Sequence, residues 1–404
     1  MTMMTRMNGL AAALALCALA ACGGSSSPLS LGSTANAQSN GVVPFTVTPV
    51  VMQVKNTPVP VKGADGLYHL VYELKLENFN GNAATVRGID AIDAGTGGTV
   101  ASLSASDLAQ RMAVNDRRTA PGTLGPAQGG LVYMHLSFKD AAAVPKTLVH
   151  RLTVAFEGAN PFVGIVARTV PAAPTALVLE PPLRGSLYIA GDACCDSTRH
   201  VRATLPLDGQ LFTSQRFAVD WEQLDEVGRI YVGDPKKVDS YNVYRKPIHA
   251  VASGKVVAAL DGLEDQTPGA LPDNLPPEHA DGNHVVLDLG DGRYALFAHM
   301  LPGSVAVSVG QTVAAGQVLG LVGNSGNSSE PHLHFHVHDG PSPLASNGLP
   351  YLMKGFTALQ RGVSTAAFDR AIADGKPIAV EPVPSPGAFV NVMPMDLWIV
   401  DFPS

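Results

Sequence analysis

Four histidines alternate with other residues in the stretch PHLHFHVHDG, positions 331–340: His332, His334, His336 and His338. This alternation is typical of a β-strand, in which side chains two positions apart share one face, so the four imidazoles are predicted to point the same way. Imidazole ligates metal ions and exchanges protons near neutral pH. Because each residue advances a strand by roughly 3.3 Å, the outer pair is about 20 Å apart and one metal ion can contact only neighbouring members.

The surroundings of this row favour chemistry at its beginning. Nine of the twelve histidines fall between positions 200 and 338, and the row follows the Gly- and Ser-rich turn GNSGNSSEP. We therefore assign a metal-binding or catalytic role to His332 and His334. We expect His336 and His338 to support them from behind or to lie at the surface.

The composition predicts a mostly β protein. Charged residues make up 15% of the 404 residues and hydrophobic residues 46%, with 41 Gly and 31 Pro. Such a profile suits short strands and many turns, and the length is sufficient for two or three domains. The formal net charge of −7, with no basic stripe, argues against nucleic acid as a partner.

The N-terminus has the features of a secretory signal. Arg6 precedes the apolar run LAAALALCALAA, which is too short for a permanent membrane helix. The sequence LAACG at 19–23 resembles a bacterial lipobox, which makes Cys22 the expected lipidation site and implies a lipid anchor in the membrane. We predict a lipoprotein signal peptide at 1–22 and a flexible tether at 23–40. The residue after Cys22 is Gly23 rather than Asp, which favours the periplasmic face of the outer membrane as the location.

Two adjacent cysteines remain after the signal region. Cys17 leaves with the signal peptide and Cys22 is the lipid site, so only Cys194 and Cys195 are left. An oxidising envelope compartment permits a vicinal disulfide between them. Two free thiols or two soft metal ligands are the alternatives, and a structural zinc knuckle is disfavoured because there is no second cysteine pair.

The chain order suggests two β domains. Short alternating runs such as LYHLVYELKLENF predict an immunoglobulin-like β-sandwich at 41–163, followed by a Pro- and Ala-rich linker at 164–190. A second domain occupies 191–340, and 341–404 form a C-terminal extension with one expected helix, AFDRAIADG. Three histidines of the first domain have no acidic or histidine neighbour at ligand spacing and are expected to be ordinary strand residues: His69, His135 and His150.

The second domain resembles a known family. The segments GNHVVLDLGDGRYALFAHM and VSVGQTVAAGQVLGLVGNSGNSSEPHLHFHV closely resemble the lysostaphin-type, LytM-like zinc endopeptidases that cut peptidoglycan peptides. The resemblance covers about residues 200–340. It implies a LytM-type antiparallel β catalytic domain with a groove across one sheet, one Zn²⁺ ion, and peptidoglycan as the partner.

The resemblance also implies the roles of individual residues. Asp220 and His334 match zinc ligands, and His299 and His332 match the two catalytic histidines. The family's first histidine ligand would fall on Arg216, which cannot ligate zinc and whose charge would disfavour a nearby cation.

A third ligand must then come from elsewhere or be absent. The free histidines of the domain are His200, His249, His279 and His284. We favour His200, because it lies in the stretch CCDSTRHVRATLP just before the strand that leads to Asp220. The assignment requires a His200 ring nitrogen within about 5 Å of the Asp220 carboxylate and the His334 ring.

Two functions from different classes follow. The first is a zinc-dependent endopeptidase that hydrolyses peptide bonds in peptidoglycan stems or cross-bridges. The alternative is a catalytically inactive LytM-like module that binds peptidoglycan or activates a cell-wall amidase, and Arg216 is the feature that favours it. Metal content would separate the two directly.

Overall fold

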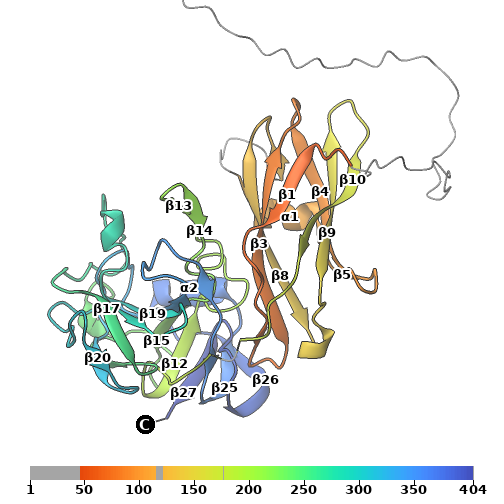
Figure 1. The fold of residues 1–404 in the computed structure, drawn as a ribbon. Coiled ribbons are helices and arrows are strands. Elements are labelled where there is room, and N and C mark those ends of the chain that lie inside the picture. Colours follow the sequence, from red (N-terminus) through yellow and green to blue (C-terminus); the bar gives the residue numbers. More distant parts are fainter. Residues whose placement is uncertain (1–45, 115–121, 176, 404) are drawn as a thin grey trace, which may run out of the picture. The chain divides into compact units, whose positions relative to one another are not determined.

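The computed structural model describes residues 46–114, 122–175 and 177–403 (Figure 1). The predicted signal peptide, the tether and Cys22 lie outside these residues. The chain divides into two units, 1–47 and 48–404, and every feature below belongs to the second. The predicted mostly β fold is confirmed.

The first domain is built from two antiparallel sheets. One has the order β1 (Val50–Val54), β3 (Tyr68–Asn78), β8 (Gly129–Phe138), β6 (Met112–Val114), with β2 (Val61–Lys62) beside β3. The other has the order β10 (Phe162–Thr169), β9 (Leu148–Phe156), β4 (Ala84–Asp93), β5 (Thr99–Ser104), with β7 (Thr123–Leu124) beside β4. Helix α1 (Ala105–Arg111) and the 3-10 turn η1 (Ala141–Ala143) complete this domain. Both sheets contribute to one hydrophobic core, so they form a β-sandwich. Its immunoglobulin-like class stays a prediction.

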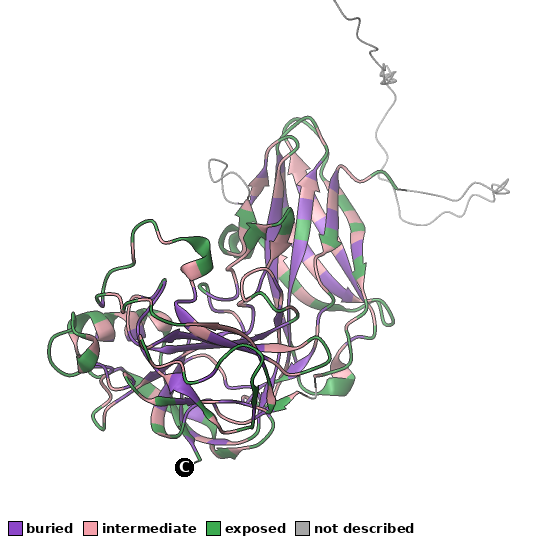
Figure 2. Cartoon of the chain, turned by 60° about the vertical axis from the view of Figure 1, so that its left-hand side comes forward, coloured by how far each residue is buried: buried purple, intermediate pink, exposed green. Residues whose placement is uncertain are grey.

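Strand β3 is buried on both of its faces along most of its length. Figure 2 shows buried stretches of the strands in purple. Its even-numbered residues from Leu70 to Leu76 belong to the sandwich core. His69, Val71 and Glu73 point the other way and are also buried, and Val71 packs into the core of the second domain. The alternation of a strand therefore gives β3 one face for each domain.

The second domain is organised on a large sheet. Within the described residues this sheet has 11 strands, and ten follow in the order β20 (Thr312–Val313), β17 (Gly254–Leu260), β18 (Asn283–Asp288), β19 (Tyr294–Met300), β22 (Leu333–His338), β15 (Val219–Gln223), β12 (Gly185–Gly191), β27 (Trp398–Phe402), β25 (Phe356–Gly362), β26 (Val380–Phe389); β23 (Gly348–Leu349) pairs with β22. The predicted histidine strand is confirmed as β22. β18 and β19 form a hairpin whose turn residues Asp291 and Gly292 have φ values of 51° and 68°, the positive values that such turns require.

Shorter elements surround this sheet. The paired strands are β11 (Val178–Leu179) with β24 (Leu352–Met353), β13 (Leu205–Leu207) with β14 (Gln210–Phe212), and β16 (Pro247–His249) with β21 (Val318–Leu321). The 3-10 turns are η2 (Val238–Ser240) and η3 (Pro277–His279). The expected C-terminal helix is confirmed as α2 (Thr365–Asp374), which begins after the N-cap Ser364 and ends at Gly375. Among the residues that the structure describes, no helix is long and apolar enough to cross a membrane.

Two predicted segments differ from what was expected of them. The stretch 164–190, expected to be a linker, contains most of β10 and all of β11, and most of β12. The C-terminal extension supplies β25, β26 and β27 to the main sheet. Its Pro-rich sequence hides these strands because β26 contains Pro382, Pro384 and Pro386, which are tolerated there since β26 is the edge strand of the sheet.

Candidate metal centre and groove

Three neighbouring strands bring the site residues together. β15 pairs with β22 so that Asp220 lies opposite His334, and the next strand, β19, lies on the other side of β22. Trp221, Phe297 and Phe335 point to the opposite face of the sheet, into the hydrophobic core. The core therefore fixes the sheet from behind while Asp220 and His334 stay on the groove side.

His299 reaches this face through an unusual backbone conformation. Its neighbour Ala298 is the residue that pairs with His334, so His299 would point to the core in a regular strand. Its φ of 58° turns the side chain instead. The backbone N–H of His299 donates to the carbonyl of Asp281, which holds this turn. The His299 ring centroid consequently lies 4.8 Å from that of His332 and 5.7 Å from that of His334.

Asp220 is the centre of the cluster. Its Oδ1 lies 2.8 Å from His334 Nδ1 and 3.4 Å from His332 Nε2, and its Oδ2 lies 3.2 Å from His200 Nε2. Donor atoms of His200, Asp220 and His334 all lie within 4.8 Å of one another, and so do those of His299, His332 and His334. The structure thus places all five predicted groove residues in one cluster.

Three of the four histidines in the cluster are oriented by a backbone carbonyl. His200, His299 and His332 each place Nδ1 within hydrogen-bond distance of a backbone carbonyl, those of Asp192, Ser325 and Glu330, at 3.0, 2.7 and 2.7 Å. A neutral imidazole whose Nδ1 donates in this way keeps its lone pair on Nε2, the atom that could then bind a metal ion. The Nε2 atoms of His200 and His332 face Asp220. His334 differs, because its Nε2 lies 2.9 Å from His336 Nδ1.

Burial and charge set the protonation of this cluster. Burial opposes the ionisation of Asp220, but the nearby His200 and His332 hold the pKa of its carboxyl well below the usual range. Burial also opposes the charge on His200, yet Asp220 raises the pKa of His200 to about 9. Burial lowers the pKa of His334, and lowers the pKa of His299 further still. The cluster therefore pairs one carboxylate with one imidazolium and keeps His299 neutral.

Arg216 lies away from this cluster, which corrects the expectation that its charge would disfavour a cation there. Its guanidinium makes two hydrogen bonds to the Glu73 carboxylate, at 2.8 and 2.6 Å, and a third to the carbonyl of Gly348 at 2.9 Å. Glu73 is 0% exposed and Arg216 5% exposed. The charge is thus neutralised by the sandwich strand β3.

His336 and His338 are not surface residues. Both are fully buried, so the surface alternative for them is wrong, and His336 contacts His334 from behind as the other alternative had it. Of the remaining histidines, His249 and His284 bond through Nδ1 to the carbonyls of Gly316 and Gly282, outside the cluster.

The cluster opens on a cavity of about 620 Å³. Besides the site residues, its walls include Gly269 and Leu271 from the loop between β17 and β18, and Phe368 and Asp369 from α2. This loop and the C-terminal helix therefore frame the groove.

Glu222 is a cavity residue that sequence analysis missed. It follows Asp220 by two positions on β15 and so shares its face, which is the signal that could have revealed it. Its Oε2 has no hydrogen-bond partner among the described residues. Burial raises the pKa of Glu222 well above its ordinary value, and the charges of Glu330 and Asp220 raise it further.

One segment of the chain matches a known family. Residues 236–346 match Peptidase family M23, which confirms the resemblance to the lysostaphin-type peptidases. The matched segment includes His299, His332 and His334 but begins after His200 and Asp220.

Individual relatives cover only part of the chain. Lysostaphin of Staphylococcus simulans is 31% identical over 117 residues, which are 28% of this chain and 20% of that protein. The chain thus matches about a fifth of the length of this relative. Among solved structures, the catalytic domain of the antimicrobial peptidase lysostaphin from Staphylococcus simulans is 22% identical, covering 40% of this chain and 88% of that one with a TM-score of 0.23. The catalytic domain of a prophage-encoded M23 protein from Enterococcus faecalis, an A109H mutant, is 21% identical, covering 42% and 92% with a TM-score of 0.24.

Proposed function

We propose that the protein is a zinc-dependent endopeptidase that hydrolyses peptide bonds of peptidoglycan. The observation that carries this proposal is the position of His200, whose Nε2 lies 3.2 Å from Asp220. Two imidazoles and one carboxylate form a donor set that suits Zn²⁺ at a catalytic site, where three protein ligands leave one position for water or substrate. In this proposal His200, Asp220 and His334 hold the ion. All three line the cavity, so substrate has access to them.

The other two histidines take the catalytic roles. A bound zinc ion supplies Lewis-acid polarisation of the scissile carbonyl and acidifies water. His299 and His332 have Nδ1 bound to backbone carbonyls, so their Nε2 atoms can accept or donate a proton or stabilise negative charge on the carbonyl oxygen. Burial lowers the pKa of His299, so its imidazole is neutral at neutral pH.

The inactive alternative rested on Arg216. The ion pair of Arg216 with Glu73 and the position of His200 beside Asp220 both favour the enzyme instead. Peptidoglycan binding or amidase activation without hydrolysis would be the results that favour the inactive module.

Metal content and hydrolysis test the proposal together. The purified mature chain is expected to hold one zinc ion in the groove and to release peptides from isolated peptidoglycan. His200→Ala should lose both, whereas His249→Ala, at a half-buried histidine outside the cluster, should keep both. Zinc-free wild-type protein that binds peptidoglycan without cutting it would overturn the proposal in favour of the inactive module.

We also propose that Cys22 is lipidated and holds the protein at the periplasmic face of the outer membrane. The lipobox-like LAACG after an apolar run supports this. Cys22→Ala should release the protein into the soluble envelope fraction. Unchanged membrane attachment would mean that the anchor lies elsewhere.

A further inference from the structure

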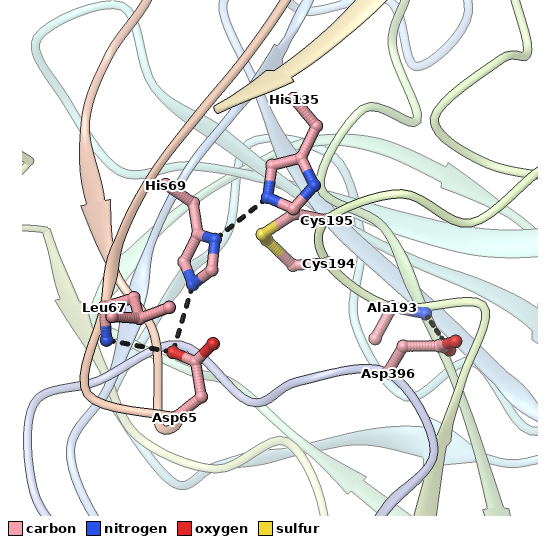
Figure 3. The surroundings of a disulfide bond; sticks show 8 residues. All are labelled: Asp65, Leu67, His69, His135, Ala193, Cys194, Cys195 and Asp396. Carbon is pink, nitrogen blue, oxygen red and sulfur yellow. Dashed lines mark hydrogen bonds and ion pairs between the residues drawn. A yellow bond between two sulfur atoms is a disulfide. The ribbon is translucent and has the colours of Figure 1, made fainter. Parts of the chain in front are cut away.

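A second cluster of potential ligands lies between the sandwich and the peptidase domain (Figure 3). His69 comes from β3, His135 from β8, and Cys195 from the loop after β12. One donor atom from each lies within 4.8 Å of the other two. His69 and Cys195 are 2% and 4% exposed. This corrects the expectation that His69 and His135 are ordinary strand residues without neighbours at ligand spacing.

The two imidazoles are oriented toward each other. His69 Nδ1 lies 2.9 Å from His135 Nε2. On its other side, His69 Nε2 donates to Asp65 Oδ1 at 3.0 Å, and this oxygen also accepts from the backbone N–H of Leu67. Asp65 therefore leaves His69 Nδ1 as the lone pair that faces His135. A carboxylate that holds a histidine in this way is the usual support of a metal-binding imidazole.

Cysteine chemistry decides whether this cluster can hold an ion. Cys195 is joined to Cys194 in a disulfide, whose sulfur atoms are weak donors. A thiolate in its place, together with two imidazoles, is a donor set that Zn²⁺ and Cu⁺ both accept. The disulfide form thus lacks the third ligand that the dithiol form supplies.

We propose that reduction of the Cys194–Cys195 disulfide completes a second metal site, in which His69, His135 and Cys195 bind a thiophilic cation. A dithiol reductant breaks the S–S bond by giving up two electrons and two protons, and becomes a disulfide itself. The two cysteines are left as thiols, and Cys195 then loses its proton to solvent as the sulfur binds the ion. The ion keeps its oxidation state throughout.

The position of this site gives it a connection to the groove. Cys195 belongs to the same loop as His200, and Tyr133 of the sandwich donates to the carbonyl of Arg202 further along it. An ion bound to two sandwich histidines would tie the beginning of this loop to the sandwich. The inference concerns binding at this second site, and it holds whether or not the groove is an active peptidase.

Metal stoichiometry of the full mature chain tests the inference. The protein is titrated without oxygen, in its disulfide form and after reduction by a phosphine, with Zn²⁺ against a chromophoric chelator and with Cu⁺ against a Cu⁺-specific chelator. Reduction is expected to add one bound equivalent of at least one of the two ions. Equal stoichiometry in both forms for both ions would overturn the proposal.

Single substitutions separate the cysteines. Cys194→Ser leaves Cys195 as a free thiol and is expected to bind the extra equivalent without reductant. Cys195→Ser has no thiolate at the site and should not bind it in either condition. His135→Ala should also lose the extra equivalent, while His284→Ala, a half-buried histidine outside both clusters, should keep it.

Controls cover folding and unspecific binding. Asp65→Asn keeps an oxygen near His69 and should weaken the extra site by about 10–100-fold without removing it. Circular dichroism and the groove equivalent of zinc report whether each variant is folded. Extra binding that persists in folded Cys195→Ser or His135→Ala protein would show that the ion lies elsewhere, and would contradict the proposal.

Discussion

The two histidine clusters of this molecule contain similar residues but differ in the position of their carboxylate and in their access to solvent. In the groove, Asp220 stands at the centre and three imidazoles surround it, at the edge of a cavity of about 620 Å³. In the second cluster, the carboxylate of Asp65 stands behind His69, and the remaining donor is a sulfur held in a disulfide. A central carboxylate and an open cavity suit substrate turnover. A buried cluster with a redox-dependent donor suits an ion that holds two segments together.

The largest expected effect concerns His332, just before β22, and His334 within it. His332→Ala should lower turnover by about 10²–10⁴-fold, the usual contribution of a general acid or base, with a modest loss of zinc. His334→Ala should lose both activity and zinc, because His334 is a proposed ligand and His332 is not. Zinc content and peptide release of each purified variant are measured side by side. Equal zinc content in the two variants would end this division of roles.

The next effect tests whether His200 has taken over the role of position 216. His200→Ala removes a proposed ligand and should weaken zinc binding by more than the roughly 10–100-fold that a supporting residue contributes. Adding Arg216→His to that variant should not restore binding, because the Arg216 side chain contacts Glu73 and Gly348. Restored affinity in the double variant would place position 216 at the groove.

The sequence predicted the parts of the groove that lie close together on the chain. The alternation of the histidines predicted the strand β22. The sequence analysis did not include Glu222 or α2 in the groove. The two-residue period of β15 could have shown that Glu222 shares the face of Asp220. The position of α2 at the cavity depends on packing between segments that are far apart on the chain, such as α2 and β15, for which no local pattern exists.

The second cluster shows the limit of spacing arguments more sharply. His69 and His135 are 66 positions apart, and they meet because β3 and β8 are neighbouring strands. Asp65 lies only four positions before His69, yet its role depends on the turn between β2 and β3. Cys195 comes from the other domain. This cluster results from strand pairing and from packing between the domains. Both depend on the core as a whole, so no short sequence pattern predicts them.

A stability effect of intermediate size tests how the sandwich is attached. Arg216→Ala leaves the fully buried Glu73 without its partner and should lower the free energy of unfolding by about 3–5 kcal/mol. Changing both residues, Arg216→Met with Glu73→Leu, should recover most of this loss because no buried charge is left unpaired. Urea unfolding measures both. Zinc affinity of the groove should be unchanged in the folded double variant, and a large loss there would mean that the groove depends on this ion pair.

The smallest expected effect lies beside the disulfide, at Asp396. Its Oδ1 accepts from the backbone N–H of Ala193 at 3.0 Å (Figure 3). Burial, and then the charge of Asp192, raise the pKa of Asp396 from 3.8 to about 7. The folded state therefore binds this proton more tightly than the unfolded state. The resulting stability is complete below about pH 4 and is lost as the pH rises through about 7.

Asp396→Asn tests this pH dependence. The amide keeps an oxygen for Ala193 and removes the buried charge, so it should stabilise the protein by on the order of 1 kcal/mol at pH 8 and by less at pH 5. Thermal unfolding at the two pH values measures the difference, with Asp291→Asn on the exposed hairpin turn as the matched control. A variant that is stabilised equally at both pH values would show that Asp396 is already ionised in the folded protein at pH 5. The segment before β27 would then carry a full negative charge beside the disulfide, and a cation at the second cluster would be favoured by that charge as well as by its ligands.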